Sequence, residues 1–298
     1  MRVESDEASA SERVADHGWS GRAAVRRVGL GARDLLFPPE CPACGADTVS
    51  SDGICAACFA DCTFIAGPTC SQCGRPEPRL PAHDPAYRCD DCRASSPAWE
   101  RAAAVALYGG TVRRLVLGLK RGDRLNTVPL MARWMHRAGR PLLAEADLIV
   151  PVPLHWTRRL ARRFNQSAEL ARAVARHAAA EGHRAAYAPG ILRRVRRTPS
   201  QEGRDRAARR ANMEGAIAVR PGAARRLAGA RVLLVDDVMT SGATLNAAAL
   251  ALRAAGVGHV DALVMALARG WGDAYLPPLS HREAAEARTP PGREGEER

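Results

Sequence analysis

Residues 232–245 place the tightest constraint on the fold of this 298-residue chain, because they combine an apolar run, two acids and a turn. The stretch reads V-L-L-V-D-D-V-M-T-S-G-A-T-L. Its four leading apolar residues are typical of a strand buried on both faces of a parallel sheet. We expect this strand to end at Asp236 and Asp237, and an Ala/Leu-rich helix to follow over about 245–255. The segment therefore predicts an α/β fold with a mostly parallel sheet flanked by helices.

The polar residues after this strand suit a sugar phosphate. Ligands of open α/β sheets bind beyond the carboxyl ends of the strands, and residues 240–244 form a turn at a helix N-terminus, where backbone N–H groups attract phosphate. Gly242 lets the backbone approach a ligand closely. Asp236 and Asp237 repel phosphate but accept hydrogen bonds from hydroxyls, as the vicinal hydroxyls of ribose 5-phosphate would require. The alternative is a buried strand and a capped helix with two surface acids.

This order of apolar quartet, paired acids and T-S-G-A-T resembles the motif of type I phosphoribosyltransferases, which bind phosphoribosyl pyrophosphate (PRPP) with Mg²⁺. The resemblance implies that Asp236 and Asp237 are catalytic residues that bind the ribose hydroxyls. It implies that the 5-phosphate is held by Thr240, Ser241, Gly242, Ala243 and Thr244. We expect Mg²⁺ to be held mostly by oxygens of PRPP and by water, because this ion rarely occupies an all-protein cage.

All nine cysteines lie between Cys41 and Cys92, and eight of them form C-x-x-C pairs. Gly45 and Gly74 follow the first and third pairs, so each C-x-x-C-G is matched with a later C-x-x-C, as in two tandem zinc ribbons. We expect two structural zinc ions, with one zinc and a degenerate second site as the alternative. Cys62 reads better as a buried apolar residue than as a ligand. The predicted ligands are Cys41, Cys44, Cys55, Cys58, Cys70, Cys73, Cys89 and Cys92.

The chain has a formal net charge of +12, which favours polyanionic ligands such as PRPP or nucleic acid. Almost all of this charge is arginine, and Lys120 is the single lysine. Whether Lys120 provides a compact ammonium near the substrate or stands there by chance is left open. No apolar stretch reaches the roughly 18–20 residues that span a bilayer, and no secretory signal is recognised, so we expect a cytoplasmic protein.

Composition divides the chain into four parts. We expect a disordered tail with a short helix over 1–36, a double zinc ribbon over 37–93, a phosphoribosyltransferase-like domain over 98–270 and a flexible tail over 271–298. Within the third part, the apolar pattern predicts strands near 102–108, 147–150, 191–192, 216–219 and 259–267, and helices near 111–120, 125–138 and 166–180.

Several motifs together resemble the ComF family, the competence protein F group, over about residues 35–269. They are L-L-F-P-P-E-C-P-A-C-G, Y-G-G, L-K-R-G-D, P-V-P-L, R-R-F-N-Q, R-T-P-S-Q and V-D-D-V-M-T-S-G-A-T. Arg163 stands where the family often has glycine before F-N-Q. The resemblance implies a type I phosphoribosyltransferase fold and a role linked to DNA uptake. It also places pyrophosphate near Pro153, Leu154 and His155, with Arg158 supplying charge.

The segment 193–210 holds eight arginines and has two interpretations. It could close over PRPP as a lid that excludes water, or it could contact the phosphates of single-stranded DNA. The segment has no aromatic residue for base stacking, which favours the lid. In either case the contacts would come from Arg196, Arg197, Gln201 and Arg204.

Two functions fit these residues. The first is a phosphoribosyltransferase, an enzyme that transfers ribose 5-phosphate from PRPP to an unknown acceptor and releases pyrophosphate. The second is a non-catalytic accessory protein that binds single-stranded nucleic acid and retains the fold. By the family resemblance, its partners would include a DNA-uptake helicase or channel protein. The sequence leaves open whether transfer is catalysed.

Overall fold

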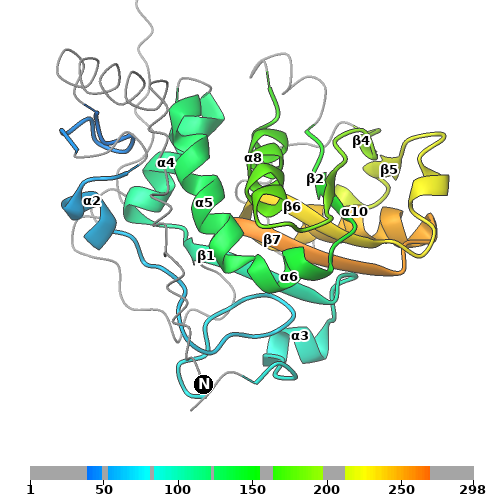
Figure 1. The fold of residues 1–298 in the computed structure, drawn as a ribbon. Helices are drawn as coiled ribbons and strands as arrows, with labels where there is room; N and C mark the ends of the chain where they lie inside the picture. The colour runs from blue at the N-terminus through cyan, green and yellow to red at the C-terminus, as the bar shows by residue number, and fades with distance from the viewer. Residues whose placement is uncertain are drawn as a thin grey trace, which may run out of the picture.

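The computed structural model describes residues 39–48, 53–80, 84–121, 124–154, 164–196 and 212–268. Its centre is a five-stranded parallel sheet with strand order β1-β7-β6-β2-β3 (Figure 1). The strands are β1 (Arg101–Leu107), β2 (Leu148–Pro151), β3 (Ala186–Tyr187), β6 (Arg231–Met239) and β7 (His259–Leu267). The chain thus has the mostly parallel sheet that the sequence predicts.

Helices cover both faces of this sheet (Figure 1). Leu233 and Val235 of β6 pack into one apolar cluster with the helices of the first face. Val232 and Leu234 point the other way and pack with α10 (Ala243–Ala254). This alternation explains why the apolar quartet is continuous. The helices of the first face are α4 (Gly110–Arg121), α5 (Val128–Ala138), α6 (Arg140–Glu145) and α8 (Gln166–Ala180).

A short antiparallel pair stands beside the carboxyl ends of the strands. It consists of β4 (Leu192–Arg194) and β5 (Ile217–Val219). Two 3₁₀ turns, η1 (Leu125–Thr127) and η2 (Ala224–Arg226), complete the domain.

The end of β6 differs from the sequence prediction. The strand does not end at the two acids but continues through Asp236 and Asp237 to Met239. It does so because β7 is equally long and offers backbone partners as far as Leu267, which lies opposite Met239. The last strand is confirmed over His259–Leu267, whereas α6 and β3 were not predicted.

Two cysteine-rich loops with short helices, α2 (Ala56–Ala60) and α3 (Asp90–Ala94), precede the sheet. Gly45 and Gly74 have φ of +79° and +73°, as the predicted ribbon turns require. The segment between the loops runs antiparallel to the edge strand β1: Ile65 N–H donates to Val105 O (2.9 Å), and Leu107 N–H donates to Thr63 O (2.9 Å). The cysteine-rich part is therefore built onto the sheet edge.

The second loop is held against the residues just before β1 by a reciprocal contact. Trp99 Nε1 donates to Gln72 O (2.6 Å), and Gln72 Nε2 donates to Trp99 O (3.2 Å).

Among the described residues, every helix is too short or too polar to cross a bilayer. The predicted tails, 1–36 and 271–298, lie outside the described residues.

Candidate functional site

The two acids of β6 occupy different environments. Asp236 Oδ1 accepts hydrogen bonds from Ser167 Oγ (2.7 Å) and from the backbone N–H of Asp237 (2.9 Å). Burial, reinforced by the neighbouring Asp237 carboxylate, raises the pKa of Asp236 to about 7. Asp237 Oδ2 lies 3.3 Å from Lys120 Nζ and forms an ion pair with it. At neutral pH Asp236 is therefore close to the midpoint of its ionisation.

Lys120 reaches the acid pair from the end of α4. Its backbone carbonyl accepts a hydrogen bond from Gln166 Nε2 (3.3 Å), which joins the end of α4 to the start of α8. The ammonium of Lys120 also lowers the pKa of Asp236 and so opposes the effect of burial. The structure thus brings the single lysine of the chain to the predicted site, a placement that the sequence left open.

The F-N-Q motif forms the start of α8. Asn165 caps the helix by accepting from Ser167 N–H (3.2 Å), and its Nδ2 donates to Val152 O (3.1 Å). Gln166 is 1% exposed, and Ser167 supports Asp236. The sequence did not reveal that Ser167 supports Asp236 or that Gln166 holds the end of α4. Two polar residues buried directly after a helix cap were the signal that could have revealed them.

The turn after β6 has the geometry of an anion site. Gly242 has φ of +70° and precedes α10, and no side chain in the described part of the protein caps this helix. Ser241 is 8% exposed, and its Oγ has no hydrogen-bond partner among the described residues. Thr240 is exposed, Thr244 is half-buried, and Ala243 begins the helix. A helix N-terminus without a side-chain cap and a buried hydroxyl without a partner among the described residues both suit phosphate.

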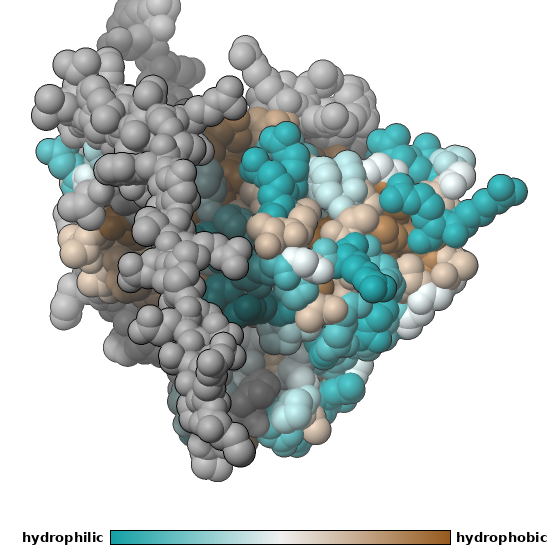
Figure 2. Space-filling model, viewed as in Figure 1, coloured by the Kyte–Doolittle hydropathy of each residue, from teal (hydrophilic) through white to brown (hydrophobic). Residues whose placement is uncertain are grey.

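A polar cavity of about 140 Å³ lies beyond the end of β2. Pro153 and Leu154 line it, as the resemblance implied for a pyrophosphate loop. His155 and Arg158 lie outside the described residues. Hydrophilic side chains project from the surface over β4 and β5 (Figure 2). The cationic residues of the cavity, which the sequence did not single out for this place, are Arg193, Arg194 and Arg220.

Arg196 has a structural contact of its own. Its Nη2 donates to the carbonyl oxygens of Asn212 (3.0 Å) and Glu214 (2.6 Å), so it joins the early part of the arginine-rich segment to residues that follow the segment. The other residues predicted for a lid or nucleic-acid contact, Arg197, Gln201 and Arg204, lie outside the described residues.

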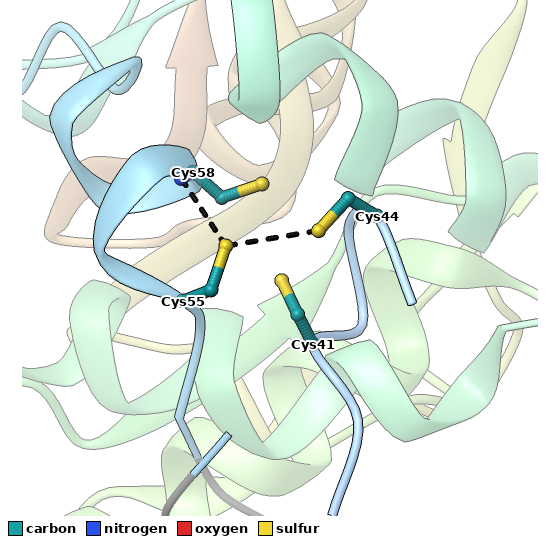
Figure 3. Close-up of side chains that lie close together, drawn as sticks. All are labelled: Cys41, Cys44, Cys55 and Cys58. Atoms are coloured by element: carbon teal, nitrogen blue, oxygen red, sulfur yellow. Dashed lines mark hydrogen bonds between the residues drawn. The ribbon is translucent and has the colours of Figure 1, made fainter. Parts of the chain in front are cut away.

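The eight paired cysteines form two four-sulfur clusters. The first consists of Cys41, Cys44, Cys55 and Cys58, and the second of Cys70, Cys73, Cys89 and Cys92. The first cluster is shown in Figure 3. Within each cluster the sulfur atoms lie within 4.8 Å of one another. The contacts are 3.7 Å between Cys44 and Cys55, and 3.8 Å between Cys73 and Cys89. A tetrahedral zinc with Zn–S bonds of about 2.3 Å requires sulfur–sulfur edges of about 3.8 Å. Both clusters therefore fit structural zinc.

Backbone and charge support the same assignment. Cys89 N–H points at Cys70 Sγ (3.3 Å), as expected around a thiolate. Hydrogen bonding with Cys73 lowers the pKa of the Cys70 thiol, and the same contact raises that of Cys73. Four crowded thiols cannot all ionise without a cation. Cys62 lies outside both clusters, and burial raises its pKa to about 12.

Known domains match both parts of the chain. A double zinc ribbon domain matches residues 32–97, and a phosphoribosyl transferase domain matches residues 156–272. Competence protein F of Haemophilus influenzae is 27% identical over 226 residues, which cover 74% of this chain and 92% of that protein. DNA utilization protein YhgH of Escherichia coli K12 is 30% identical over 199 residues, which cover 65% of this chain and 81% of that protein.

Among solved structures, the allosteric regulatory enzyme of purine biosynthesis overlaps with 50% of this chain and 30% of its own, at 19% identity and a TM-score of 0.33. At this TM-score the similarity supports no conclusion about the fold or function of this chain. The two domain matches, the relatives and the paired cysteine clusters agree with one another. The chain therefore belongs to the ComF family, with a double zinc ribbon joined to a phosphoribosyltransferase-type domain.

Proposed function

We propose that the chain binds PRPP, or a closely related ribose 5-phosphate ligand, with Mg²⁺ at the carboxyl end of β6. The ribose hydroxyls would donate to Asp236 and Asp237, and the 5-phosphate would lie in the turn 240–244. The observation that carries this proposal is the buried Ser241 hydroxyl, which has no partner among the described residues and lies just beyond the acid pair. A phosphate oxygen would accept its hydrogen bond.

The pyrophosphate would occupy the cavity beyond β2. Pro153 and Leu154 provide its wall, and the two arginines of β4 together with Arg220, which follows β5, provide positive charge. Guanidinium groups pair with phosphate oxygens through two hydrogen bonds. Mg²⁺, when bound, would neutralise oxygens of the ligand and hold its phosphates in one geometry.

The same arrangement would support transfer of ribose 5-phosphate. The bond between C1 and the pyrophosphate oxygen breaks, its electron pair leaves with pyrophosphate, and an acceptor nucleophile bonds to C1. Asp236 and Asp237 would orient the ribose, while the cationic cavity stabilises the leaving group. In the unliganded protein, Lys120 offsets the charge of Asp237 and so keeps the acid pair stable.

Calorimetric titration with PRPP and Mg²⁺ tests the binding site. We expect Asp237→Asn to weaken binding at least 10-fold, because a hydrogen bond to a charged group contributes about 1.5–3 kcal/mol. Asp90→Asn is the matched control, since it removes the same charge from a fully exposed position on α3. Equal affinity in the native protein and Asp237→Asn would contradict the proposal.

A second function, binding of single-stranded nucleic acid, is favoured by an aromatic cluster beside α5. Phe59 is 55% exposed, its ring centroid lies 5.1 Å from that of Phe64, and Phe64 meets Trp134 edge-on at 5.1 Å. These rings and Arg137 line a cavity of about 440 Å³. An exposed ring backed by two partly buried rings and a cation suits base stacking. The relatives' names, competence protein F and DNA utilization protein, agree with a DNA-related role.

Fluorescence anisotropy with a labelled single-stranded oligonucleotide tests this second function. We expect Phe59→Ala to weaken binding by roughly 5- to 160-fold, which corresponds to about 1–3 kcal/mol per stacked base. Leu250→Ala is the control, because it truncates a similarly exposed apolar residue on α10. Unchanged binding in Phe59→Ala would exclude the aromatic cluster as the stacking surface.

We also propose a reducing, cytoplasmic location, because free cysteines clustered as zinc ligands are typical of proteins kept away from oxidising compartments.

A further inference from the structure

A separate group of ligand-forming side chains lies at the opposite end of α8 from the acid pair. His136, in the last turn of α5, meets Glu181 and His183, which follow α8. One ligand atom from each residue lies within 4.8 Å of the others. Because α8 starts beside Asp236 and is 15 residues long, the trio is about 20 Å from that residue.

Two nitrogen atoms in this trio lack partners. The side chain of His136 is 9% exposed, and its buried Nε2 has no hydrogen bond among the described residues. Nε2 of His183 is likewise buried and without a hydrogen bond in the described part of the chain. Each nitrogen lies 3.7 Å from Glu181 Oε2, which is beyond hydrogen-bond distance. Such buried polar atoms cost free energy unless a ligand satisfies them.

The backbone fixes these positions. Gly182 has φ of +83°, and His183 N–H donates to Ala178 O (3.0 Å), so the chain folds back under the end of α8. Glu181 is the C-cap of that helix. The C-terminal ends of α5 and α8 both face the trio, and helix C-termini carry partial negative charge that attracts cations.

The surrounding charges are compatible with a cation. Arg140 Nε lies 3.0 Å from Glu181 Oε2, and a second lone pair of that carboxylate oxygen remains for a cation. Burial lowers the pKa of His136, which favours the neutral imidazole that binds metal ions. His177 stacks near His136, with ring centroids 5.7 Å apart, but does not belong to the trio.

We propose that His136, Glu181 and His183 form a binding site for a divalent transition-metal ion of the zinc, cobalt or nickel type. Two imidazoles and a carboxylate are ligands of this class of metal. A tetrahedral ion with metal–nitrogen bonds of about 2.0–2.1 Å has ligand–ligand edges of about 3.4 Å. The 3.7 Å separations therefore require only a small contraction. The ion would join the ends of α5 and α8 and keep at least one position for water.

Cobalt titration of the full-length protein, with its cysteine clusters already loaded with zinc, tests the proposal. We expect the native protein to bind one Co²⁺ that His183→Gln and Glu181→Gln bind at least 10-fold more weakly. The difference spectrum between native protein and variant should show visible cobalt bands without thiolate charge-transfer absorption. Absorption from Co²⁺ bound at the cysteines or at Asp236 is the same in both proteins and cancels in the difference spectrum.

His177→Gln is the matched control, because it removes a neighbouring imidazole from outside the trio and should leave Co²⁺ binding unchanged. Equal Co²⁺ affinity in the native protein and both trio variants would overturn the proposal, as would an equal loss in His177→Gln. A second measurement needs no variant. Excess Ni²⁺ should raise the thermal midpoint of the native zinc-loaded protein, and an unchanged midpoint would also overturn the proposal.

Discussion

At the scale of single residues, Lys120 tunes the charge of the acid pair, so its removal should change the pH dependence of ligand binding. The ammonium lowers the pKa of Asp236, which stands at about 7. Under the proposed function, ionised Asp236 accepts the ribose hydroxyls, and affinity for PRPP should rise as pH increases through 7. In Lys120→Met the pKa of Asp236 should be higher, and the rise should move to higher pH.

Titrations from pH 6 to 9 measure this shift. Lys120→Arg keeps the charge and should give a curve close to that of the native protein. Ionisation of PRPP itself is common to all three proteins and cancels in the comparison. Superimposable curves for the native protein and Lys120→Met would show that the ion pair has no part in binding.

Asp236 also carries a prediction about stability. Its pKa is about 7 in the folded protein, against an ordinary value of 3.8, so the folded state binds more protons than the unfolded state between these values. Stability therefore falls as pH rises through this window. The free-energy cost of ionising the buried carboxyl is complete above pH 7. Asp236→Asn should raise stability at pH 8 by about 1–2 kcal/mol, and the gain should shrink toward pH 5.

Thermal unfolding at the two pH values measures this difference, with Asp90→Asn as the exposed control. Because Asn Oδ1 can still accept from Ser167 and from the following N–H, the substitution preserves both hydrogen bonds of Asp236. A lower midpoint for Asp236→Asn at pH 8 would contradict the prediction.

At the scale of elements, the two zinc ribbons differ in how well they protect their ligands. All four cysteines of the second cluster are buried, whereas Cys44 is exposed and Cys55 is half-buried in the first. A chelator should therefore remove the first zinc faster than the second. Biphasic zinc release, followed with a colorimetric indicator, is the expected result.

Matched variants identify the phases. Cys44→Ser should abolish the fast phase and Cys73→Ser the slow phase, while Cys62→Ser should preserve both because Cys62 lies outside the clusters. A single phase in the native protein would show that exposure does not control release.

At the scale of the whole molecule, the sequence predicted the features that are determined by residues close together in the chain. Four C-x-x-C pairs gave both clusters, because the ligand spacing is set within each pair. The apolar quartet gave the central strand, because burial on both faces leaves a continuous run. The full length of β6 could not be predicted, since it depends on the partner strand β7. The meeting of Lys120, Ser167 and the acid pair depends on three distant elements, α4, α8 and β6.

The segment 63–65, which runs antiparallel to β1, has a consequence for self-association. An edge strand that no segment covers presents a row of unpaired N–H and C=O groups, which can pair with another chain. Because this segment connects the two cysteine clusters, its position on β1 depends on both of them being folded. Metal starvation would uncover the strand, so the apoprotein should aggregate through its β1 edge.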